Sequence, residues 1–178
     1  MEALQEAIPD YAKDIRLNLS SVLTKEGSPG LSEKQIAAAA LASAYAAKSE
    51  PVAKSLHAYA SEFLNDSEIR GVKSAAVIMA MNNVYYRFTH LVSDKDYASM
   101  PARLRMTVIA NPGMEKLDFE LASLAVSAIN GCGACMEAHA HQAVRAGVTK
   151  EGIQSTVRIA AVVTGAAQAL AIAGFAKG

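Results

Sequence analysis

Residues 32–45 read Ser-Glu-Lys-Gln-Ile-Ala-Ala-Ala-Ala-Leu-Ala-Ser-Ala-Tyr, and this stretch decides the fold class. Ser32 followed three residues later by Gln35 is the signature of a capping box, in which two side chains satisfy free backbone N–H groups at a helix start. Apolar residues then recur at helical spacing from Ile36 to Tyr45. The stretch therefore predicts a helix that starts at Ser32 and runs to about residue 49.

The rest of the chain repeats this helical character. Alanine, the best helix former, accounts for 36 of the 178 residues. Strict alternation of apolar and polar residues is nearly absent, and residues 106–109 are the only plausible strand. We expect a single all-α domain over residues 1–178. Prolines, glycines and capping residues such as Thr149 place its other helices at about 10–23, 51–64, 67–87, 115–129, 133–146 and 150–175.

An internal repeat links the two halves of the chain, at about 30–90 and 115–176. Residues 71–75 match residues 152–156, and residues 41–44 run beside residues 124–127. Each half is then a helix, a break and two further helices. The first half acts as a scaffold, and the second carries the chemically distinctive residues.

Charge and hydropathy exclude several classes of protein. The 17 basic and 17 acidic side chains balance, so we expect no nucleic-acid partner. The N-terminus lacks a basic stretch followed by an apolar one, which argues against a signal peptide. Residues 159–176 are uncharged but rich in small side chains, and we expect a buried helix there rather than a membrane span. These features predict a cytoplasmic protein.

The two cysteines of the chain, Cys132 and Cys135, follow directly after Asn130-Gly131. The dipeptide ends one helix, so the cysteines open the next. The first turn of a helix carries unpaired N–H groups and the positive end of the helix dipole, and both favour a reactive thiolate. Because the cysteines are three residues apart, their sulfurs share a helix face and are close enough for a disulfide.

His139 and Glu120 are the candidate proton-transfer groups near the cysteines. His139 lies four residues after Cys135, one turn along the same face, where an imidazole can take the thiol proton. Glu120 belongs to the preceding helix and can orient His139, or relay a proton, if the two helices pack side by side.

Other interpretations of these residues are less favoured. The thiols could be buried structural residues. A zinc site needs four ligands, and only His139 and His141 lie nearby, so we expect no metal. Covalent haem attachment needs a histidine directly after the second cysteine, where this chain has Met136. Residues 85–87 could line a pocket, although core and surface roles are more ordinary.

The spacing of Glu120, Cys132, Cys135 and His139 resembles the site of the alkyl hydroperoxidase D proteins, in the carboxymuconolactone decarboxylase superfamily. Further stretches with this resemblance cover nearly the whole chain, at residues 14–19, 81–87, 109–113 and 125–132. The chain departs from the family pattern at Ala134, where a family member has a histidine directly before the second cysteine.

The resemblance implies an all-α fold with duplicated halves, assembled as a homotrimer. It implies reduction of alkyl hydroperoxides with no bound cofactor, and regeneration of a peroxiredoxin of the AhpC type. The electron donor would be dihydrolipoamide or the lipoyl group of a 2-oxoacid dehydrogenase component.

The resemblance also implies roles for the four residues. Cys135 would attack the peroxide and become a sulfenic acid, and it would form the mixed disulfide with the peroxiredoxin. Cys132 would supply a proton and then resolve the sulfenic acid to the Cys132–Cys135 disulfide. His139 and Glu120 would form the proton relay.

Some alternatives stay open. In thioredoxin-like sites the first cysteine is usually the exposed nucleophile, which favours Cys132, whereas the spacing to His139 and the resemblance favour Cys135. A carboxymuconolactone-type decarboxylase gives no reason for a thiol pair at a helix start. A non-enzymatic thiol redox switch is the third possible function.

Overall fold

The helix that begins after Ser32 lies at the centre of the molecule. In the computed structural model, which describes residues 1–175, Ser32 Oγ accepts the backbone N–H of Gln35, and Gln35 Oε1 accepts that of Ser32. Every residue from Ile36 to Ala44 is buried. A helix that is apolar on all sides must pack on several neighbours. This helix accordingly contacts four others of the bundle, before and after it in the chain.

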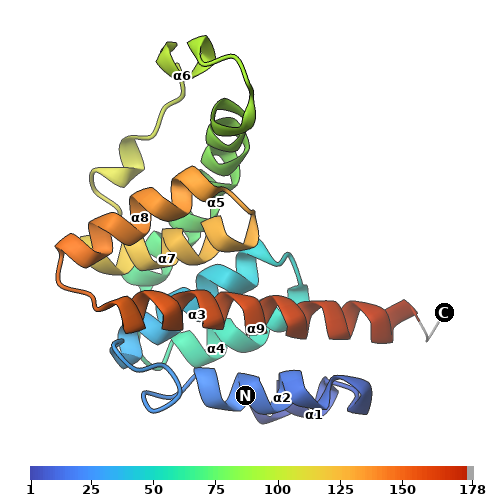
Figure 1. Cartoon of the computed structure of the whole chain (residues 1–178). Coiled ribbons are helices and arrows are strands. Elements are labelled where there is room, and N and C mark those ends of the chain that lie inside the picture. The colour runs from blue at the N-terminus through green and yellow to red at the C-terminus, as the bar shows by residue number, and fades with distance from the viewer. Residues whose placement is uncertain (176–178) are drawn as a thin grey trace.

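All regular elements within residues 1–175 are helices, which confirms the expected all-α fold (Figure 1). In chain order they are α1 (Glu2–Ala7), the 3₁₀ helix η1 (Asp10–Ala12), α2 (Lys13–Val22), α3 (Glu33–Ala46), α4 (Glu50–Ala60), α5 (Asp66–Leu91), α6 (Asp96–Ser99), the 3₁₀ helix η2 (Thr107–Ile109), α7 (Lys116–Ile129), α8 (Gly133–Arg145) and α9 (Lys150–Phe175).

Residues 106–109, the one stretch that could have formed a strand, contain the 3₁₀ helix η2, in agreement with the expected all-α domain. A strand needs a neighbouring strand to pair its backbone N–H and C=O groups, and the described part of the chain has none. Two short helices, α1 and α6, were not predicted. Helix α5 also runs four residues beyond the predicted end at residue 87, to Leu91.

Helix α7 is the second central helix. It packs along α3, and every residue from Asp118 to Ser127 is buried. Both helices are rich in alanine and also contain serine, and small side chains let helix backbones approach closely. The order of α3–α5 and of α7–α9 agrees with the arrangement expected for two repeated halves, and the duplication itself stays a prediction.

Helix α9 is buried on one face only. It packs against α2, α3 and α7, whereas Ile172 and Phe175 are exposed on its other side. Within residues 1–175 it is the one helix that is long and apolar enough to cross a membrane, with a mean hydropathy of 1.6 over 18 residues and one third of that window buried. Core helices of globular proteins also meet these two criteria. The expectation of a buried helix therefore holds for one face, and Ala176 lies outside the described residues.

The C-terminal part of α5 extends away from the bundle and carries α6 at its far end (Figure 1). The chain then returns through the largely irregular residues 100–115 to the start of α7. This return segment contributes one wall of the cavity beside the cysteines.

Candidate active site

The turn between α7 and α8 presents the two cysteines. Gly131 has φ of +67°, a left-handed conformation that glycine adopts without strain. The turn is closed by the backbone N–H of Cys132, which donates to the carbonyl of Ser127 at 3.1 Å. Cys132 is the N-cap of α8, and its Sγ accepts the backbone N–H of Cys135 at 3.3 Å. One of the free N–H groups of this helix start, that of Cys135, therefore points at the sulfur of Cys132.

Cys132 and Cys135 are joined by a disulfide, with their Cα atoms 5.3 Å apart. The two differ in access. Cys132 has no exposed surface, whereas Cys135 is 6% exposed and lines a cavity. A reagent that enters the cavity meets the sulfur of Cys135. The more accessible cysteine is thus the second of the pair, in contrast to thioredoxin-like sites.

The structure brings His139 and Glu120 together, because α7 and α8 pack side by side. Nδ1 of His139 lies 2.7 Å from Oε2 of Glu120, and the side chains are only 14% and 10% exposed. A carboxylate accepts hydrogen bonds, so Nδ1 carries the proton. Nε2 is then the ring nitrogen that can exchange a proton, and it lies 3.1 Å from Sδ of Met79 at the cavity wall.

The cavity beside Cys135 has a volume of about 290 Å³ and mostly apolar walls. Three elements line it: α5 contributes Met79, Asn82 and Tyr86, the return segment contributes Met106 and Ile109, and α8 contributes Ala134, Cys135, Ala138 and His139. The small side chain of Ala134 lies where a histidine was expected from the family pattern. In this chain the cavity therefore has His139 as its imidazole.

A chain of hydrogen bonds fixes the cysteine turn to α5. Asn83 Nδ2 donates to Ser127 Oγ at 2.9 Å, and Asn130 Nδ2 donates to Asn83 Oδ1 at 2.9 Å. The guanidinium of Arg87 donates to the carbonyl of Asn130 at 2.7 Å. Because Ser127 lies in the last turn of α7 and Asn130 at its C-terminal end, these bonds hold the segment that leads into Cys132 against α5.

Sequence reasoning missed most of the cavity wall. Met79, Asn82 and Tyr86 are spaced at i, i+3 and i+7, which predicts that they share a face of α5. Nothing in this spacing indicates that the face lies against α8. Tyr86 does line the cavity, whereas Arg87 holds the cysteine turn.

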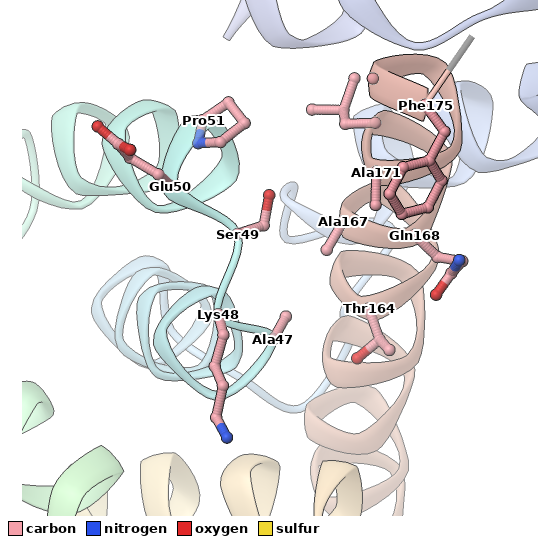
Figure 2. A pocket seen from close by; sticks show the side chains of 12 residues that line it. Ala47, Lys48, Ser49, Glu50, Pro51, Thr164, Ala167, Gln168, Ala171 and Phe175 are labelled. Carbon is pink, nitrogen blue, oxygen red and sulfur yellow. The ribbon is translucent and has the colours of Figure 1, made fainter. Parts of the chain in front are cut away.

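A larger hollow of about 420 Å³ lies between the start of α4 and the end of α9 (Figure 2). Ala47 and Ser49 face Ala167 and Ala171 across it. The residues that line it include no cysteine and no histidine. The hollow has polar side chains, from Lys48, Ser49, Glu50 and Thr164, but it lacks both a thiol and an imidazole, and we place the candidate site at Cys135.

No metal centre is found among residues 1–175, since no three His, Cys, Asp or Glu side chains are grouped so that they could hold an ion. A thiol pair, an imidazole and a carboxylate, of which Cys135 and His139 line the apolar cavity, can carry out thiol–disulfide and peroxide chemistry.

Comparison with known proteins shows the family to which this chain belongs. Residues 95–178 match the carboxymuconolactone decarboxylase family. An alkyl hydroperoxide reductase AhpD of Coxiella burnetii (strain Dugway 5J108-111) is 51% identical over 168 residues, which cover 94% of this chain and 95% of the relative. Proteins of the same name from Rhodopseudomonas palustris (strain BisA53) and Hyphomonas neptunium (strain ATCC 15444) are 54% and 53% identical, over 91% and 96% of this chain and 88% and 93% of their own lengths. From this identity over nearly the full length, the chain belongs to the AhpD family of alkyl hydroperoxide reductases, within the carboxymuconolactone decarboxylase superfamily.

Proposed function

We propose that this protein is a dithiol peroxidase that reduces alkyl hydroperoxides through Cys135 and Cys132. The observation that carries the proposal is the position of Cys135, whose sulfur lines an apolar cavity together with an imidazole that a buried carboxylate orients. Relatives more than half identical to this chain are named alkyl hydroperoxide reductase AhpD. The proposal assigns the same reaction to this chain.

In the proposed cycle, His139 takes the proton of the Cys135 thiol, and the thiolate attacks the terminal oxygen of the hydroperoxide. The O–O bond breaks, and the alkoxide leaves with the proton of Cys132 as an alcohol. Cys135 is now a sulfenic acid. The Cys132 thiolate attacks the Cys135 sulfur, and hydroxide leaves with the proton held by His139 as water. The two cysteines end as a disulfide, and the peroxide has taken up two electrons.

A dithiol then restores the pair. One of its thiolates attacks Sγ of Cys135, which is the sulfur reached from the cavity, and Cys132 leaves as a thiolate. The second thiol of the donor attacks the mixed disulfide and frees Cys135. A dihydrolipoyl group fits these requirements, because it carries two thiols at the end of a narrow, largely apolar arm that can enter the cavity.

Peroxide turnover tests the function. Protein supplied with dihydrolipoamide and tert-butyl hydroperoxide should consume both reagents in equal amounts, and Cys135→Ser should abolish the reaction. Unchanged turnover in Cys135→Ser would overturn the proposal. Absence of turnover in the unmodified protein would instead favour the decarboxylase or a redox switch.

The proposed protein partners are a peroxiredoxin of the AhpC type and a lipoyl-bearing 2-oxoacid dehydrogenase component, in the cytoplasm. Cys132→Ser leaves Cys135 without its resolving thiol, so it should trap an oxidised peroxiredoxin as a mixed disulfide. If the unmodified protein consumes dihydrolipoamide but Cys132→Ser traps no peroxiredoxin, the proposal that a peroxiredoxin is a partner is wrong.

We also propose the homotrimer as the assembled state. Val77, Val84, Phe88 and Leu91 share one face of α5, and all four side chains are exposed. An apolar stripe of this length on an extended helix is typical of a surface covered by another chain. Sedimentation should show three copies, and Val84→Asp should favour the monomer. A monomer in the unmodified protein would contradict the trimer.

A further inference from the structure

Met79 is a buried methionine of α5 whose sulfur contacts the imidazole of the site, and the cycle described above gives it no role. Its side chain is 1% exposed and lines the same cavity as Cys135 and His139. Sδ of Met79 lies 3.1 Å from Nε2 of His139, at a hydrogen-bonding distance and angle. The sulfur therefore lies at the ring nitrogen that exchanges a proton, rather than elsewhere on the imidazole.

The contact is favourable in only one protonation state of His139. Nδ1 donates its proton to the Glu120 carboxylate, so Nε2 of the neutral ring carries a lone pair. A thioether sulfur also presents lone pairs and has no proton to donate, so it forms no hydrogen bond with a bare Nε2. In the imidazolium both ring nitrogens are donors, and the sulfur is a weak acceptor for the Nε2–H group. The geometry therefore suits His139 after it has taken up a proton.

The surroundings of Nε2 give this acceptor its importance. The His139 side chain is only 14% exposed, and the cavity that it lines has mostly apolar walls. A charged N–H group that is shielded from water and lacks an acceptor is costly. Glu120 on α7 satisfies Nδ1, and Cys135 and Tyr86 are the other titratable side chains at the cavity. Met79 supplies an acceptor at Nε2 without adding another titratable group.

We propose that Met79 is a positioning residue that stabilises the protonated form of His139. When the S–H bond of Cys135 breaks, the proton goes to Nε2, and Sδ of Met79 accepts the new N–H group. The ion pair of thiolate and imidazolium is then favoured over the neutral thiol and imidazole. This inference deepens the proposed peroxidase function and rests on it, because the Cys135 thiolate is the group that attacks the peroxide.

Three substitutions separate the sulfur from the space that it fills. Met79→Leu keeps an apolar side chain of similar volume and removes the acceptor, and cores tolerate this exchange well. Met79→Gln has a similar length and restores an acceptor as an amide oxygen. Met81→Leu is the matched control, because it makes the same exchange two residues along α5, on a different face of the helix.

The ratio of thiolate to thiol at Cys135 is measured in the reduced, full-length Cys132→Ser protein, in which Cys135 is the one remaining cysteine. The ultraviolet absorbance of the thiolate is followed against pH without peroxide, so restricted entry of a substrate cannot change the result. Met79→Leu should lower the ratio at neutral pH by about three- to tenfold, the effect of one weak hydrogen bond. Met79→Gln should recover at least part of this loss, and Met81→Leu should keep the unmodified ratio.

The same substitutions in the protein with both cysteines connect the thiolate to the reaction. Oxidation of the reduced protein by tert-butyl hydroperoxide is followed by rapid mixing as the loss of free thiols. Because the thiolate is the attacking group, Met79→Leu should slow this step by the same factor by which it lowers the thiolate ratio.

Three results would overturn the inference. An unchanged thiolate ratio in Met79→Leu would show that the sulfur does not stabilise the imidazolium. Equal losses in Met79→Leu and in folded Met79→Gln would show that packing, and not an acceptor, is what matters at this position. An equal loss in Met81→Leu would show a general effect on α5. If the thiolate ratios change as expected but the unmodified protein consumes no hydroperoxide, the proposed function is wrong and the role of Met79 in the ion pair is supported.

Discussion

Replacing Glu120 by glutamine tests how much the carboxylate contributes to the reactivity of Cys135. Oε2 of Glu120 lies 2.7 Å from Nδ1 of His139, and both side chains are largely shielded from solvent. A hydrogen bond to a charged group contributes about 1.5–3 kcal/mol, roughly twice that of a neutral bond. Glutamine keeps a neutral acceptor and loses the charge that stabilises the imidazolium. We therefore expect a loss of about 1–2 kcal/mol, or about 5- to 30-fold in kcat/KM for the hydroperoxide.

The assay is steady-state turnover of tert-butyl hydroperoxide with dihydrolipoamide. Glu137→Gln is the matched control, because this exposed residue of α8 lines a surface hollow away from the cysteine cavity. It should keep the unmodified rate. His139→Gln removes the proton acceptor itself and should lower kcat/KM by about 100-fold or more. If Glu120→Gln keeps the unmodified rate while His139→Gln loses it, the Glu120 carboxylate does not contribute to proton transfer by His139.

Three further predictions follow from single features of the structure. A Cβ at Gly131 or at Gly133 meets open space, but only Gly131 of the two has a positive φ. Urea unfolding should therefore show that Gly131→Ala lowers the free energy of unfolding by about 1 kcal/mol. Gly133→Ala should leave it unchanged or raise it slightly. Burial raises the pKa of the Asp118 carboxyl group, so this group stays protonated to higher pH in the folded state than in the unfolded state. The folded protein therefore loses stability as the pH rises from the unfolded-state pKa of Asp118 through its folded-state pKa. Asp118→Asn should therefore be more stable than the unmodified protein at neutral pH, and urea titrations at lower pH should show the difference shrinking. In reduced single-cysteine variants, iodoacetamide should modify Cys135 faster than Cys132, because only Cys135 reaches the cavity; equal rates would contradict the access argument.

Much of the fold could be predicted from local sequence signals. The capping box at Ser32 and the cap at Thr149 mark helix starts that the structure confirms. The same kind of signal was overlooked at Asn65, whose side chain caps α5 in a capping box with Glu68. The irregular return segment was harder to predict, because it contacts the distant helix α5, as in the bond from Ser67 Oγ to the carbonyl of Gly113, and no local pattern encodes such contacts.

The candidate site divides in the same way. Cys132 is the N-cap of α8, and Cys135 and His139 lie within α8, so their sequence spacing alone places them together. Glu120 needed the further assumption that α7 and α8 pack side by side, which the structure shows. Asn82 lies far from the cysteines in sequence. Its position in the cavity depends on how α5 packs against α8, and no local pattern encodes that.

Labelling of the sulfenic acid tests the central claim most directly. Reduced Cys132→Ser protein is treated with one equivalent of tert-butyl hydroperoxide in the presence of dimedone, and the modified residue is identified by mass spectrometry. Because Cys135 lines the cavity and has no resolving thiol in this variant, the account predicts a single dimedone adduct on Cys135. An unlabelled Cys135, together with an adduct on Cys132 in the Cys135→Ser variant, would contradict it.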